Sequence, residues 1–264
     1  MRSMWLVYDT PRAQRNRWMI DHYTATAPRH GLQCTLVLAD GPLPDAVPEL
    51  ALFRCVDPAL RAQLEQRGVV CHNGTELAGI ANDKWATYLY FKERGCAVME
   101  TQLAAGHTLI PPYVVKPRDG HGGAGVELVE KPVRDPVNDL VQDANENLIV
   151  QALADTPGVD LRVYLLGGSV QAAMLRQSKT SFKSNFSLGG SAQIYPLNDD
   201  ALAAIAQLVQ VAPILSQGLC GVDFIRHQSR WVLNEIEDVV GMRMLYTQTE
   251  LDIVDKHLAY LVQA

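Results

Sequence analysis

Paired cysteines, long apolar runs and excess positive charge are scarce in this sequence. The five cysteines lie far apart and form no C-x-x-C pair: Cys34, Cys55, Cys71, Cys96 and Cys220. Buried free thiols are therefore favoured over a structural zinc site or a nucleophilic cysteine. The net charge of -6 argues against a surface built for nucleic acid or anionic lipid, although it leaves room for a local basic pocket.

Membrane-directing segments are also lacking. The N-terminal stretch MRSMWLVYDT becomes polar within ten residues, so it has no signal-peptide core. No apolar run approaches the roughly 18 residues of a membrane helix. We therefore expect a soluble cytoplasmic protein whose main partner is neither nucleic acid nor a membrane, while homo-oligomerisation stays open.

What the chain does contain is enough apolar material for two or three compact lobes, with 264 residues that are 48% hydrophobic. Its first part alternates strand-like and helix-like segments: strands at 4–8, 33–39, 51–55 and 69–73, and helices at 13–29 and 57–68. Asp57 fits an N-cap, and Gly68 fits a helix stop. This order predicts a small parallel sheet that ends near residue 75.

The rest of the chain mixes short strands with helices. A helical stretch at 76–95, with Asn82 or Asp83 as a cap within it, is expected to link the lobes. Further elements are expected as strands at 113–117, 125–130, 147–153, 160–168, 169–177, 220–226 and 231–237, and as helices at 134–145 and 199–217. No internal repeat interrupts this order.

Four glycines fall between two β-branched runs in VVKPRDGHGGAGVELV, directly after Lys116: Gly120, Gly122, Gly123 and Gly125. Glycines allow positive φ, so successive N–H groups can turn toward an anion. No G-K-[ST] follows, as a Walker motif requires, and a strand rather than a helix comes next. The segment reads as a hairpin, either an anion-binding one or a flexible surface turn.

Two apolar strands near the C-terminus carry acids. Side chains alternate along a strand, so Glu235 and Glu237 fall on one face while Ile236 faces the other way. Asp223 lies on the preceding strand, and a hairpin would bring the three carboxylates together. Such a cluster suits a hard cation such as magnesium, although a solvated acidic face is the alternative.

Cations and amide donors gather in the segment between these two. Its strands carry Arg162 and Arg176, and a polar loop then offers Lys179, Lys183, Ser184 and Asn185 before two further glycines, Gly189 and Gly190. This composition suits a polyanion such as a nucleotide triphosphate. A solvated hairpin is the alternative.

The order of these parts resembles the ATP-grasp superfamily, most closely its RimK-type α-L-glutamate ligase branch. Eight motifs occur in family order at near-family spacing: NDKWATYLYF, VVKPRDGHGGAG, IVQAL, GVDLRVYLLGGSVQAAMLRQ, FKSN, LGG, CGVDF and NEIE. The resemblance implies an α/β chain of the α+β ATP-grasp type. A pre-ATP-grasp lobe at 1–75 would precede an ATP-grasp domain at 76–264, whose two subdomains would hold ATP between them.

The resemblance also assigns residues. It implies that ATP is contacted by Lys84, Lys116, Gly120, His121, Gly122, Gly123, Gln151, Ala152, Leu153, Asp160 and Lys183. It implies that the terminal phosphate and the acyl phosphate are held by Arg162, Arg176 and Asn185. Magnesium, with manganese as an alternative, would be bound by Asp223, Glu235 and Glu237.

The chain departs from the family pattern at an ATP contact, at a metal ligand and in the acceptor-side loop that bears on substrate identity. Lys183 replaces an arginine, Glu237 replaces an asparagine, and EDVVG replaces the usual N-x-S-P-G. The family implies ligation of a small-molecule or peptide carboxylate to an amine through an acyl phosphate. An ATP-binding protein without ligase activity, regulatory or phosphotransferring, is the alternative.

Residues outside these motifs are secondary candidates. Among the histidines, His121 in the glycine loop is the one with a prospective role at the site. Substrate contacts are expected where the first strand of the α/β sheet ends, at Tyr8, Arg12, Arg15 and Asn16.

Overall fold

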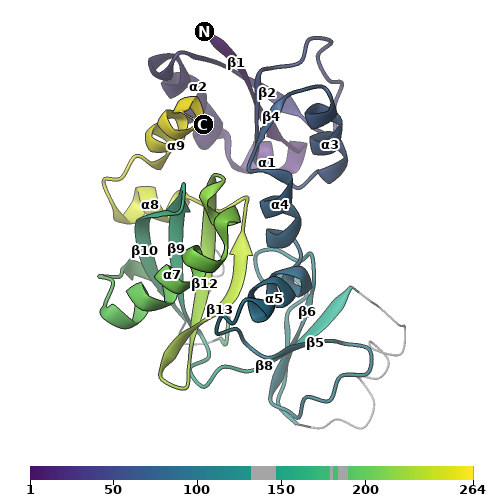
Figure 1. The fold of residues 1–264 in the computed structure, drawn as a ribbon, viewed down its shortest axis with the longest axis vertical. Coiled ribbons are helices and arrows are strands. Elements are labelled where there is room, and N and C mark those ends of the chain that lie inside the picture. Colours follow the sequence, from purple (N-terminus) through teal and green to yellow (C-terminus); the bar gives the residue numbers. More distant parts are fainter. Residues whose placement is uncertain (132–146, 179–180, 184–189, 264) are drawn as a thin grey trace.

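The computed structural model describes residues 1–131, 147–178, 181–183 and 190–263. Its strands form three sheets: a four-stranded sheet near the N-terminus, a second four-stranded sheet, and a five-stranded sheet (Figure 1). The sheets lie against one another with helices between and around them. This mixture of parallel and antiparallel sheets confirms the predicted fold class.

The first sheet is parallel, in the order β2-β1-β3-β4. Its elements are β1 (Arg2–Tyr8), α1 (Thr10–Arg15), α2 (Arg17–Thr26), η1 (Ala27–His30), β2 (Leu32–Leu38), β3 (Leu50–Phe53), α3 (Pro58–Gln66) and β4 (Val70–His72). Asp57 caps α3 as predicted, because its Oδ1 accepts a hydrogen bond from Leu60 N at 2.9 Å. Gly68, with φ of +83°, ends the turn after α3.

The single helix predicted at 13–29 is wrong. Asn16, with φ of -118° and ψ of 27°, leaves the helical region and separates α1 from α2. The last residues continue as a 3-10 turn, with Pro28 in its first positions.

The second sheet is antiparallel, in the order β5-β8-β6-β7. It follows two helices, and the elements are α4 (Thr75–Ala81), α5 (Lys84–Glu93), β5 (Thr101–Leu103), β6 (Tyr113–Pro117), β7 (Glu127–Val129) and β8 (Leu148–Ala152). The stretch predicted at 76–95 is thus two helices. Asp83 is extended there and accepts hydrogen bonds from Trp85 N and Ala86 N, so the predicted cap is confirmed.

The third sheet is antiparallel, in the order β11-β10-β9-β12-β13, and α7 packs on it. Its elements are β9 (Val159–Leu166), β10 (Ser169–Gln177), β11 (Ser191–Ile194), α7 (Asp199–Val211), η3 (Pro213–Ser216), β12 (Leu219–His227) and β13 (Arg230–Glu237). The helix predicted at 199–217 stops at Val211, and Pro213 starts a 3-10 turn. The helix predicted at 134–145 lies outside the described residues.

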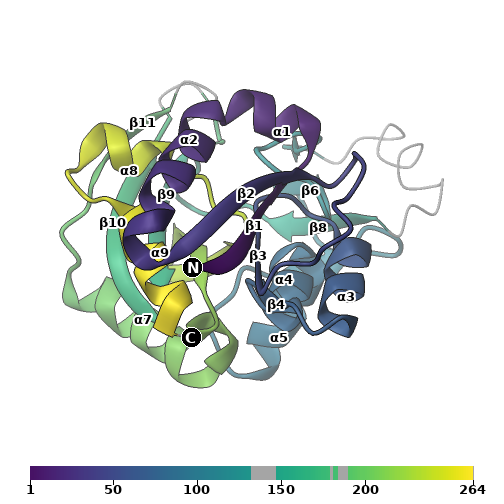
Figure 2. The same cartoon turned by 90° about the horizontal axis from the view of Figure 1, so that it is seen from above.

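Two C-terminal helices, α8 (Arg243–Gln248) and α9 (Ile253–Gln263), bring the chain back to the first sheet. Figure 2 shows α9 beside α2, and these helices share one core cluster with β1. The N- and C-terminal parts of the chain are thereby packed together. Within the described residues, every helix is too short or too polar to cross a membrane.

Candidate active site

Three carboxylates meet on the hairpin of β12 and β13, as predicted. Asp223 pairs with Glu235 across the strands, and one carboxylate oxygen each from Asp223, Glu235 and Glu237 lies within 4.8 Å of the others. A β-bulge shifts the register of the two strands between Asp223 and Phe224. Asp223 lies opposite Glu235, but the next residue, Phe224, lies opposite Leu233. Leu233 and Ile236 consequently face the same core, although strict alternation would place them on opposite faces. The bulge therefore directs the acids to the side away from that core.

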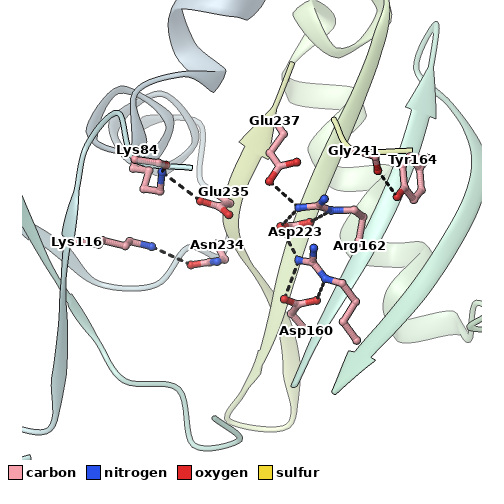
Figure 3. Close-up of polar contacts among 12 residues, drawn as sticks. Lys84, Lys116, Asp160, Arg162, Tyr164, Asp223, Asn234, Glu235, Glu237 and Gly241 are labelled. Carbon is pink, nitrogen blue, oxygen red and sulfur yellow. Dashed lines mark hydrogen bonds and ion pairs between the residues drawn. The ribbon is translucent and has the colours of Figure 1, made fainter. Parts of the chain in front are cut away.

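Two buried arginines surround Asp223 (Figure 3). Arg162 stands opposite Asp223 on β9 and donates two hydrogen bonds to it, at 2.7 and 2.6 Å, and a third to Glu237 Oε1 at 2.7 Å. Arg176 donates to Asp160 Oδ2 and to Asp223 Oδ2, both at 2.7 Å. Asp223 thus shares the Arg162 guanidinium with Glu237 and the Arg176 guanidinium with Asp160.

This arrangement separates the pKa values of the acids. Burial alone would raise the pKa of Asp223, but the charges of Arg162 and Arg176 lower it to about 2. Burial raises the pKa of Glu237, and the attraction of Arg162 does not cancel that effect. The charges of Asp223 and Glu235 add to the rise in the pKa of Glu237, whereas at Asp223 the arginines prevail.

Lys116 from the second sheet and Lys84 from α5, two of the predicted ATP contacts, approach the same strand, β13. The Lys116 ammonium donates to Gln151 Oε1 at 3.0 Å and to Asn234 Oδ1 at 3.3 Å. Burial lowers the pKa of Lys116 to about 8. Lys84 Nζ lies 3.5 Å from Glu235 Oε2, so a second cation reaches the acids from another element.

The glycine segment is the turn of the antiparallel β6–β7 hairpin, as the sequence predicts. Gly122, Gly123 and Gly125 have φ between 65° and 80°, the region that favours glycine. Lysines from outside the hairpin hold it: Lys84 donates to Gly120 O, and Lys183 donates to Gly123 O at 3.0 Å. The turn is thus held by two lysine side chains from other parts of the chain.

Two neighbouring cavities open on this cluster and share Gly122 and Arg176. The smaller, of about 130 Å³, lies between the second and third sheets and includes Lys84, Lys116, Gln151, Asp160, Lys183 and Glu235. The larger, of about 530 Å³, reaches the first sheet and includes Arg12, Arg54, His121, Arg162, Glu237 and Arg243. The buried acids and arginines lie where the two cavities adjoin.

Comparison with known proteins identifies the family to which the chain belongs. The sequence profile of the RimK-like ATP-grasp domain matches residues 96–261. The chain belongs to the RimK-like ATP-grasp family. A "Probable alpha-L-glutamate ligase" of Hydrogenovibrio crunogenus (strain DSM 25203 / XCL-2) is 28% identical over 217 residues, which are 77% of this chain and 70% of that protein. The family is one of ATP-dependent ligases, and this chain is one of them.

Solved structures with the same fold support the architecture. The D-cycloserine synthetase DcsG superposes with a TM-score of 0.77 at 17% identity, over 99% of either chain. The ATP-grasp ligase PsnB, complexed with minimal precursor, Mg and ADP, superposes with a TM-score of 0.70 at 14% identity. That match covers 98% of this chain and 97% of PsnB. At such identities the likeness establishes the ATP-grasp fold alone.

The predicted ATP contacts gather around the smaller cavity, with one exception. Its lining includes Lys84, Lys116, Gly120, Gly122, Gly123, Gln151, Ala152, Leu153, Asp160 and Lys183. His121 lines the larger cavity instead. Asn185 lies outside the described residues. The contact roles of all these residues stay predictions.

Sequence reasoning missed Asn234, which lines the smaller cavity and accepts a hydrogen bond from Lys116. Its place beside Glu235 in NEIE was the available signal. It also missed Arg54, a cation directly after the buried strand β3. Of the first-lobe candidates, Arg12 and Asn16 line the larger cavity, whereas Tyr8 is buried and Arg15 is exposed.

The acid cluster suits the magnesium that the family uses. Its donors are carboxylate oxygens, the hard ligands that magnesium prefers. Glu235 and Glu237 keep 21% and 22% of their side chains exposed, so both are accessible from the cavities. Asp223 is buried, and its two oxygens already accept three hydrogen bonds. A carboxylate has roughly four lone-pair sites, so this occupancy leaves room for a metal bond.

Proposed function

We propose that the chain joins a carboxylate to an amine in an amide bond, at the expense of ATP and through an acyl phosphate. The observation that carries this proposal is the junction of the two cavities. The two cavities adjoin at Arg176 and Gly122, beside the acids and arginines, and we assign the smaller to the nucleotide and the larger to a second substrate. A nucleotide bound in one cavity would present its terminal phosphate to a substrate in the other.

In the first step, a carboxylate oxygen of the substrate attacks the γ-phosphorus, and the bond from that phosphorus to the ADP oxygen breaks. Lys84, Lys116 and Lys183 would face the phosphate oxygens, where their charge offsets the charge that develops. Arg162 and Arg176 would hold the transferred phosphate. Magnesium, when bound by Asp223, Glu235 and Glu237, would neutralise part of the phosphate charge.

In the second step, the amine nitrogen attacks the carbonyl carbon of the acyl phosphate. The carbon–oxygen bond to phosphate breaks, phosphate leaves, and the nitrogen loses a proton. Each of these steps transfers a group between substrates, so no protein nucleophile is required. The turn at 119–125 would keep water from the acyl phosphate while the amine reacts.

Coupled product analysis tests this function. The protein is incubated with ATP, magnesium and a mixture of amino acids and short peptides, and phosphate and new amides are measured together. We expect phosphate release to match amide formation. ATP binding without turnover would favour a regulatory nucleotide-binding protein, and phosphorylated substrate without amide would favour a phosphotransferase.

Variants of the acid cluster give matched controls. Glu235→Ala is expected to lose magnesium-dependent turnover by at least a hundredfold, on the order of the loss of an electrostatic catalytic group. Glu237→Asn restores the amide of the family pattern and should keep part of the activity. Glu100→Ala, which removes an exposed acid paired with Lys92, should leave turnover unchanged. Full activity of Glu235→Ala would contradict the proposed metal site.

A further inference from the structure

Arg54 is a buried cation on the wall of the larger cavity. It follows β3, is 7% exposed, and donates from Nη2 to Val240 O at 2.7 Å. The guanidinium hydrogen-bonds the Tyr8 side chain and is attracted by the charge of Asp238, but its Nε is buried without a hydrogen-bond partner, and no carboxylate of the described residues lies within ion-pair distance. A guanidinium stays charged in a protein, and burying it unpaired is costly. A ligand anion in the cavity would offset that cost.

The place of Arg54 in the fold is a second, independent indication. In the order β2-β1-β3-β4, the chain leaves β1 toward β2 on one side and returns with β3 on the other. The carboxyl ends of β1 and β3 therefore flank a topological switch point, where open α/β sheets bind ligands. Arg12 and Asn16 follow β1, Arg54 follows β3, and all three line the same cavity.

One part of the wall of this cavity is apolar, although other polar and charged side chains also line it. Trp18 and Met19 come from α2, and Met242 and Met244 come from the segment after β13. Arg12, the neighbouring cation, is already paired with Asp9. The cavity thus offers a buried guanidinium without an ion-paired carboxylate, beside indole and thioether surfaces.

We propose that the substrate of the larger cavity carries an apolar side chain and a carboxylate that is not consumed, and that this carboxylate binds Arg54. An amino acid or short peptide with an apolar residue has this chemistry. Its reacting group would point to the end at Arg176 and Gly122, where the two cavities adjoin. This inference rests on the proposed function, because it assigns the second cavity to a ligase substrate.

Direct binding tests the inference without turnover. Leucine, leucinamide and glutamate, in both configurations, are titrated calorimetrically into the whole chain with AMP-PNP and magnesium. We expect leucine to bind at least tenfold more tightly than leucinamide and more tightly than glutamate. Equal binding of leucine and leucinamide, tighter binding of glutamate, or binding of none of the three would overturn the proposal.

Variants of Arg54 locate the carboxylate. Arg54→Gln keeps a donor for Val240 O but loses the charge, and we expect the preference for leucine over leucinamide to fall below twofold. Arg54→Lys should retain it, as should Arg17→Gln, an exposed arginine paired with Asp21. An unchanged preference in Arg54→Gln would overturn the assignment. If Arg54→Gln does not fold, the wild-type comparison still decides.

Different results would contradict the proposed ligase reaction and the proposed role of Arg54. Selective binding of leucine without amide formation would remove the proposed reaction and leave only the carboxylate-binding role of Arg54. Amide formation with equal binding of leucine and leucinamide would remove only the inference.

Discussion

Lys116 shows how one residue depends on its surroundings. Its ammonium is buried between the amide oxygens of Gln151 and Asn234, which accept hydrogen bonds without neutralising the charge. Burial therefore governs its pKa, and the more distant charge of Glu235 offsets only part of the effect. The sequence placed Lys116 on a strand before the glycines. It could not give the pKa, which depends on burial and on charges such as that of Glu235, contributed by segments distant in the sequence.

We predict that nucleotide affinity falls as pH rises through 8, because the free protein then loses the Lys116 proton that a phosphate needs. With a pKa of about 8, the protonated fraction falls about tenfold between pH 7 and pH 9, and the affinity for AMP-PNP should fall similarly. Calorimetric titration at the two pH values measures this. Lys116→Met should bind weakly with little pH dependence, and an identical dependence in that variant would assign it to another group.

At the scale of the element, the β6–β7 hairpin and β13 illustrate what local patterns can predict. Alternation correctly put Glu235 and Glu237 on one face, because both follow the bulge. The bulge itself depends on how β12 pairs with β13, and no local pattern reveals it. The hairpin was predicted from its glycines and flanking strands alone. The contacts of Lys84 and Lys183 with its turn come from distant segments and were not predicted.

We predict that nucleotide binding slows amide exchange in the turn at 119–125. Lys84 and Lys183 hold two of its carbonyl groups, and a triphosphate beneath the turn would add further partners. Hydrogen exchange followed by mass spectrometry with and without AMP-PNP and magnesium measures this, with β12 in the central part of the third sheet as the internal control. Equally slow exchange in both states would count against a nucleotide-covering role.

At the scale of the whole molecule, the first sheet is tied to the acid hairpin and to the C-terminus. The buried Arg61 forms an ion pair with Asp238, with 3.6 Å between Nη2 and Oδ2. Asn73 Nδ2 donates hydrogen bonds to Leu219 O at 2.9 Å and to Asp238 O at 3.0 Å. These contacts fix the segment after β13 against the first sheet, with the larger cavity beside it. The sequence predicted the first sheet, but these long-range contacts depend on how the sheets pack. A lobe boundary near residue 75 stays a prediction.

The packing of α9 on α2 predicts how the stability of the fold depends on pH. His257 is buried, burial lowers its pKa to about 3, and its Nδ1 hydrogen-bonds Tyr23 Oη at 2.8 Å. The unfolded histidine takes up a proton near pH 6.5 while the folded one does not, so stability is lost as pH falls below 6.5. Between pH 7 and pH 5 this histidine alone should lower the unfolding free energy by about 2 kcal/mol.

Urea unfolding at the two pH values checks this effect. His257→Gln should lose that part of the pH dependence. Tyr23→Phe, which removes only the hydrogen-bond partner, should lower stability at both values and keep the dependence. An unchanged slope in His257→Gln would show that the acid sensitivity arises elsewhere.

The most direct test of the ligase account follows oxygen from substrate to phosphate. A carboxylate substrate found by the coupled assay is labelled with ¹⁸O in both carboxylate oxygens and converted with ATP, magnesium and its amine partner. If the carboxylate attacks the γ-phosphorus, one labelled oxygen leaves with inorganic phosphate and the other remains in the amide, and mass spectrometry should find both. Unlabelled phosphate accompanying a new amide would contradict the acyl-phosphate mechanism on which this account of the site depends.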